Sequence, residues 1–117
     1  MRWITAIVIF LTLACSSPER KAEQARDELA SWAATGEVLS QQWSRGKVAR
    51  PFVKSTLDVA SESVKALADS SGNAAAARRI AQLYDSFSRA VENDDHAAAG
   101  LLSSKFGTIS KALQKPQ

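Results

Sequence analysis

The sequence predicts an all-α fold, a small antiparallel up-down four-helix bundle, and three observations support it. Apolar residues recur at steps of three and four in four successive segments beyond residue 17, which is the period of an amphipathic helix. This part of the chain is rich in alanine, poor in glycine and almost without proline, a composition that favours helices. The connections between the segments are short, so consecutive helices should lie antiparallel in one domain over residues 19–115.

The first helix is expected from Pro18 to Arg45, with Ser17 as its cap. Gly36 lies within its apolar stripe, which indicates either close packing of a neighbouring helix or a break at that point. Trp32 and Trp43 are expected in the core, and Trp43, being nearer the helix end, is expected to be the more exposed of the two. The stripe consists of Ala22, Ala25, Leu29, Trp32, Gly36, Leu39 and Trp43.

Three further helices are expected over Pro51–Ser70, from the cap Asn73 to about Asn93, and from a cap at Asn93 or Asp94 to about Leu113. Each carries its own apolar stripe. The stripes are Val53, Leu57, Ala60, Val64 and Leu67; then Ala77, Ile80, Tyr84, Phe87 and Val91; then Ala99, Leu102, Phe106, Ile109 and Leu113.

The first connection carries the densest basic cluster in the chain, flanked by two aromatic residues. Basic and aromatic side chains together indicate contact with a partner, such as a protein or an anionic component. The alternative is that the basic side chains form ion pairs within the protein. In an up-down bundle this connection faces the acidic segment Glu92–Asp95, and the opposite charges would pair. The predicted partner-contact residues are Trp43, Arg45, Lys47, Arg50 and Phe52.

Composition and single residues argue against several functions. The net charge of +3 is too small to indicate nucleic-acid binding. With one cysteine the chain has no intrachain disulfide or Cys-based metal site, and the lone histidine, His96, is expected to be solvated at the start of the last helix. No catalytic residues, metal or cofactor are predicted, and the protein is not expected to be an enzyme.

Arg2 is followed by a 12-residue apolar run, from Trp3 to Ala14, and then by Cys15. The run is too short to span a membrane but has the length of a secretory signal. The stretch Leu11-Thr12-Leu13-Ala14-Cys15 resembles the lipobox of bacterial lipoproteins, in its relaxed form. The resemblance implies a signal peptide over residues 1–14, cleavage between Ala14 and Cys15, a covalent lipid on Cys15 and a tether over residues 15–18. The alternative is an ordinary signal peptide that leaves a free thiol.

The lipoprotein resemblance also implies a location. Ser16 follows the lipidated position and implies the outer membrane, facing the periplasm. The expected function is a membrane-anchored, non-catalytic binding or adaptor module of the bacterial cell envelope. Two alternatives remain: a carrier that holds a small apolar ligand in a gap beside Gly36, Trp32 and Phe87, and a self-assembling structural lipoprotein.

Overall fold

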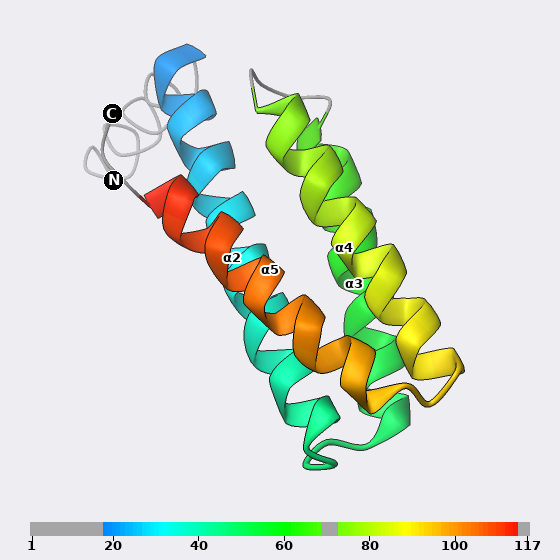
Figure 1. The fold of residues 1–117 in the computed structure, drawn as a ribbon. Helices are drawn as coiled ribbons and strands as arrows, with labels where there is room; N and C mark the ends of the chain where they lie inside the picture. Colours follow the sequence, from blue (N-terminus) through cyan, green and yellow to red (C-terminus); the bar gives the residue numbers. More distant parts are fainter. Residues whose placement is uncertain (1–17, 69–72, 115–117) are drawn as a thin grey trace, which may run out of the picture.

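The computed structural model describes residues 18–68 and 73–114, which form an all-α four-helix bundle, as the sequence predicts (Figure 1). Helix α2 spans Pro18–Ser44, α3 spans Arg50–Ala68, α4 spans Ala74–Glu92 and α5 spans His96–Gln114. The expectations for the signal peptide, Ala14, Cys15 and most of the tether lie outside the described residues.

The bundle is built from two closely packed helix pairs. Helix α2 makes its most extensive contact with α5, and α3 makes its own with α4, whereas α2 and α3 contact each other much less. In Figure 1 the α2–α5 and α3–α4 pairs diverge toward the end at which α2 begins. The α2/α3 and α4/α5 sides of the molecule are opposite faces, because the helices follow one another around the bundle in chain order.

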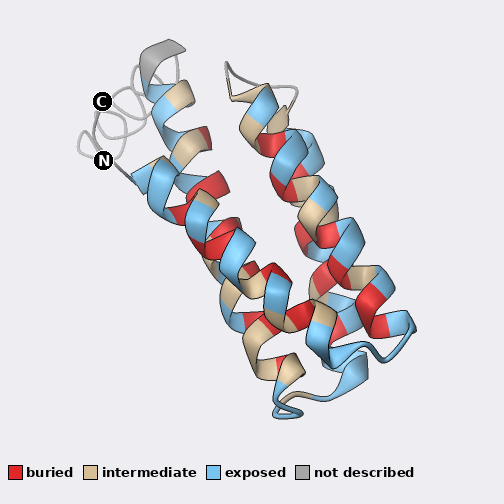
Figure 2. Ribbon diagram, viewed as in Figure 1, coloured by how far each residue is buried: buried red, intermediate tan, exposed pale blue. Residues whose placement is uncertain are grey.

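The predicted apolar stripes face one another in the core (Figure 2). The largest fully buried side chains include Tyr84, Phe87, Phe106, Leu29 and Ile80. All the buried side chains among the described residues lie between Ala25 and Ser110. A chain that begins at Ser16 therefore retains every core contact that the structure describes.

Helix α2 is continuous through Gly36, which answers the question that the sequence left open. A Cβ atom at this position would lie 2.6 Å from two ring atoms of Phe106 on α5. The missing side chain thus lets the Phe106 ring pack directly against the α2 backbone. Close packing, rather than a helix break, is the physical reason for glycine here.

Helices α2 and α4 end at the same end of the bundle, and each is followed by a residue in the left-handed backbone conformation. Gly46 has a φ of 70°, and the amides of Gly46 and Lys47 donate to the carbonyls of Trp43 and Gln42 at 2.9 Å each. This is the Schellman pattern that ends many helices. Asp94 has a φ of 54° and occupies the equivalent position after α4, where glycine is usual.

Two predicted caps differ from the observed ones. Asp95 caps α5, since its Oδ1 accepts from the Ala98 amide at 3.0 Å, so the prediction of Asn93 or Asp94 is wrong. Asp94 cannot serve because it completes the left-handed turn after α4. Asn73 precedes α4 as predicted, but its side-chain amide donates to the Ala22 carbonyl on α2 at 3.2 Å and makes no capping bond.

No helix within the described ranges 18–68 and 73–114 is long and apolar enough to cross a membrane.

Candidate binding surface

Trp43, one of the predicted contact residues, is buried, with only 3% of its surface exposed. Its indole packs against Phe87, with 6.3 Å between the ring centroids, and is covered by His96. Of the two tryptophans that the structure describes, Trp32 is the more exposed, lying half-buried at the edge of the core. The expectation that Trp43 would be the more exposed is therefore wrong, because a side chain from α5 covers it.

His96 is partly exposed but makes three specific contacts. Its ring stacks on Trp43 with 4.1 Å between centroids and 15° between planes. Its Nδ1 donates to the Trp43 carbonyl oxygen at 2.9 Å, and its Nε2 lies 3.3 Å from Asp94 Oδ1. Among the described residues no group of three or more His, Cys, Asp or Glu side chains is placed to hold a metal ion. His96 acts here as a structural link between helix ends.

Arg50, at the start of α3, pairs with Asp94 in the α4–α5 connection. Its Nη2 lies 3.0 Å from Asp94 Oδ1, and the two side chains are 47% and 67% exposed. The internal pairing of the basic and acidic connections is therefore confirmed for this pair. At such exposure it contributes only about 0–1 kcal/mol to stability.

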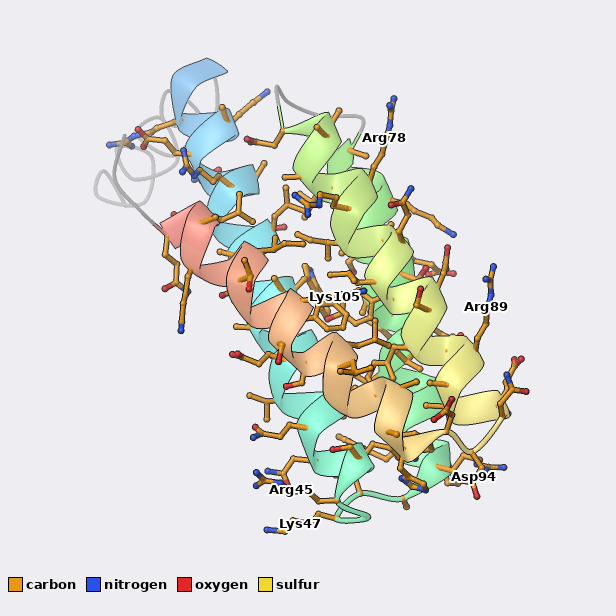
Figure 3. All side chains as sticks on the ribbon, in the orientation of Figure 1. Arg45, Lys47, Arg78, Arg89, Asp94 and Lys105 are labelled. Atoms are coloured by element: carbon orange, nitrogen blue, oxygen red, sulfur yellow. The ribbon has the colours of Figure 1, made fainter. Side chains whose placement is uncertain are left out.

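Arg45 and Lys47 lie in the α2–α3 connection and are exposed. Both side chains point away from the end of the bundle (Figure 3). Neither makes a side-chain hydrogen bond or ion pair with any residue that the structure describes. These two cations, unlike Arg50, are therefore available to pair with an external partner.

Phe52 lies on the first turn of α3, is 58% exposed and borders a groove of about 520 Å³ between α2 and α3. Val38 of α2, 55% exposed, lies on the other wall. The groove follows from the weak contact between these two helices, which leaves their facing side chains partly uncovered. It is lined by Ser31, Ala34, Thr35, Val38, Leu39, Gln42, Val48, Phe52 and Thr56.

No charged side chain lines this α2/α3 groove. Its two threonine hydroxyls donate to carbonyls of their own helices, Thr35 to Ser31 and Thr56 to Phe52, each at 2.9 Å. Their hydrogens are therefore already used, and the remaining surface is mainly apolar. Such a surface can bury a partner's apolar side chains without leaving a charge desolvated.

Sequence reasoning identified Phe52 but missed Val38, which lies one residue before the buried Leu39 and off the predicted stripe. The sequence of α3 does contain a weak indication of this surface. Phe52, Thr56 and Val59 are spaced by four and three residues and form a second, uncharged stripe beside the core stripe. Val59 is 55% exposed, so the stripe reaches the surface.

The gap expected for an apolar-ligand carrier is filled at Gly36. The Phe106 ring occupies that space, and Tyr84 packs against Phe106 with 4.8 Å between centroids. The Tyr84 hydroxyl donates to the Trp32 carbonyl. The carrier alternative thus loses the feature that suggested it.

Comparisons with protein-family models, with characterised proteins and with solved structures found no match to this chain.

Proposed function

We propose that this protein is a membrane-anchored, non-catalytic binding module of the bacterial cell envelope that contacts a partner protein through the α2/α3 groove. The observation that carries the proposal is the pairing of half-exposed Val38 and Phe52 across an uncharged groove. Apolar side chains exposed together in this way are typical of interaction sites. An aromatic residue beside a pocket is the usual centre of binding energy in such contacts.

Arg45 and Lys47 supply the electrostatic part of the proposed contact. They lie in the connection that joins the two helices of the groove and have no internal partner among the described residues. Exposed charges at the rim of an interface raise the association rate and select partners of opposite charge. The partner is therefore expected to place acidic side chains beside the apolar ones that enter the groove.

Anchoring is proposed on the lipobox resemblance of residues 11–15. A diacylglyceryl group on Cys15 supplies two acyl chains, and two chains hold a protein stably where one gives marginal binding. Ser16 supports the outer membrane as the location. A lipid-held domain diffuses in two dimensions and meets envelope partners at a raised local concentration.

Site-specific photo-crosslinking in intact host cells tests the binding proposal. A photoreactive residue at Phe52 should give one discrete adduct, and Val38→Asp should remove that adduct by placing a charge in the groove. The matched control is the same photoreactive residue at Leu101, which is 70% exposed on the opposite face. Identical adducts from both positions, or an adduct at Phe52 that is insensitive to Val38→Asp, would contradict the proposed surface.

A further inference from the structure

A second groove lies on the opposite face, between α4 and α5, with a volume of about 470 Å³. It differs in charge from the α2/α3 groove, because two cations, Arg79 of α4 and Lys105 of α5, line it. Leu83 and Ile109 provide an apolar floor and are only partly buried. In Figure 3 Lys105 lies over the boundary between the two helices.

Neither cation is neutralised internally. Arg79 and Lys105 are exposed and make no ion pair or side-chain hydrogen bond with any residue that the structure describes. Leu101, at 70% the most exposed large apolar side chain among the described residues, lies one helical turn before Lys105 on α5. The face thus combines exposed cations with an exposed leucine, the pair of features that interfacial helices present to a bilayer.

The helices of the two faces also differ in charge. Helices α4 and α5 together carry five Lys and Arg residues against two Asp and Glu residues, whereas α2 and α3 together carry six against seven. The helices of the α4/α5 side therefore attract an anionic surface more strongly than those of the α2/α3 side.

The groove lies toward the end of the bundle at which α2 begins. Arg26, in the first half of α2, donates from Nε to the Leu113 carbonyl at the end of α5, at 2.8 Å. Asn73, just before α4, contacts Ala22 of α2. The groove residues Ala112, which precedes Leu113, and Arg79, on the second turn of α4, therefore lie toward the end of the bundle at which α2 begins.

We propose that the α4/α5 face docks on an anionic phospholipid bilayer, with Arg79 and Lys105 at the phosphate groups and Leu101 inserted among the headgroups. The orientation rests on the anchoring proposed above, because three chain steps from Cys15 to Pro18 reach at most about 11 Å and hold this end at the membrane. The opposite α2/α3 groove then faces away from the bilayer, where a partner protein can reach it.

Vesicle co-sedimentation of an unlipidated chain that begins at Ser16 tests the proposal. The chain should bind vesicles of phosphatidylcholine mixed with phosphatidylglycerol, but not vesicles of phosphatidylcholine alone. The double variant Arg79→Ser/Lys105→Ser should lower the partition coefficient roughly 30-fold. Leu101→Ser should lower it several-fold, whereas all variants keep the helical circular dichroism signal, because the three side chains are exposed.

The matched control is Lys54→Ser/Lys65→Ser, which removes the same charge from two exposed positions on α3, on the opposite face, and should change binding little. Equal losses in the two double variants would overturn the proposal, since they would mean attraction by net charge rather than by one face. Binding of monomeric dodecyl phosphate without binding of vesicles, or a dimer in solution that Arg79→Ser/Lys105→Ser abolishes, would also overturn it. The assay does not involve Cys15. A negative result would therefore leave the anchoring proposal unaffected, and the absence of a lipid on Cys15 would leave vesicle binding by the α4/α5 face unaffected.

Discussion

The imidazole of His96 stacks on the indole of Trp43, with 4.1 Å between the ring centroids, and its Nδ1 donates to the Trp43 carbonyl oxygen at 2.9 Å. This relationship joins the last turn of α2 to the first residue of α5. It buries a tryptophan that would otherwise lie at an open helix end. It also places Asp94 and Arg50 beside the same connection, so the far end of the bundle is held by one small cluster.

Replacing His96 with alanine should lower the free energy of unfolding by about 1–2 kcal/mol, the combined value of one aromatic stack and one hydrogen bond. The emission of Trp43 should shift to longer wavelength as water reaches the ring, which a Trp32→Phe background isolates in a chain that begins at Ser16. Ser104→Ala is the matched control, since Ser104 is exposed on the same helix, and it should be neutral. Unchanged stability and emission in His96→Ala would show that the stack has no structural role.

Gly36→Ala should destabilise the bundle, although alanine is the better helix former by about 1 kcal/mol. The added Cβ would lie 2.6 Å from ring atoms of Phe106, which is fully buried. Overpacking of this kind costs about 1–3 kcal/mol, which exceeds the gain in helix propensity. Chemical denaturation measures the difference.

Gly100→Ala is the matched control for that substitution. Its nearest neighbours, atoms of the Ser44 side chain, lie 4.0 Å from the added Cβ, so the change should be neutral or stabilising. A second variant, Gly36→Ala/Phe106→Leu, should recover part of the loss by making room. If Gly36→Ala and Gly100→Ala stabilise the protein equally, the close α2–α5 packing is refuted.

Burial raises the pKa of the Tyr84 hydroxyl above its usual range, because the phenolate would lose its hydration. The folded state therefore holds the proton at pH values where the unfolded chain releases it. This stabilising contribution is complete below about pH 10 and falls as pH rises above that value, by about 1.4 kcal/mol per pH unit. Tyr84→Phe should show a correspondingly weaker loss of stability in alkali, measured by urea unfolding at a series of pH values. Parallel curves for the two proteins would contradict the assignment.

Asp94 has a left-handed backbone conformation and also forms an exposed ion pair, and different substitutions measure the contribution of each to stability. Asp94→Gly should be more stable than Asp94→Ala by about 1 kcal/mol, because glycine adopts a φ of 54° without a steric cost. Loss of the pair with Arg50 should cost less than about 1 kcal/mol, since both side chains are largely exposed. A double-mutant cycle of Asp94→Asn with Arg50→Gln measures this coupling, and a value well above that limit would mean that the pair is stronger than its exposure indicates.

The core stripes were predictable because large apolar residues at helical spacing dominate the pattern, as Val53, Leu57 and Val64 illustrate on α3. The tight α2–α5 contact was less predictable. It buries Ser40 and Ser110, whose hydroxyls donate to the carbonyls of Gly36 at 2.6 Å and Ala30 at 3.3 Å. Small and polar residues of this kind do not add to the apolar pattern of a helix. The spacing of apolar residues in α2 therefore does not reveal that α5 covers a second side of this helix.

The candidate surfaces depended still more on tertiary packing. Trp43 was assigned to a contact surface, but its exposure depends on His96, 53 residues further along the chain. Arg79 and Lys105 lie on different helices, and nothing in the sequence indicates that they line one groove. Phe52 was identified because an aromatic residue stood next to a local basic cluster, which is information that the sequence does contain.

Intact-mass analysis of the protein extracted from host membranes tests whether the proposed lipid on Cys15 holds the bundle at the envelope membrane. The expected chain begins at Cys15 and carries the added mass of a diacylglyceryl group, and Cys15→Ser should lose both the added mass and the membrane fractionation. A chain recovered from the periplasm with an unmodified thiol on Cys15 would contradict it.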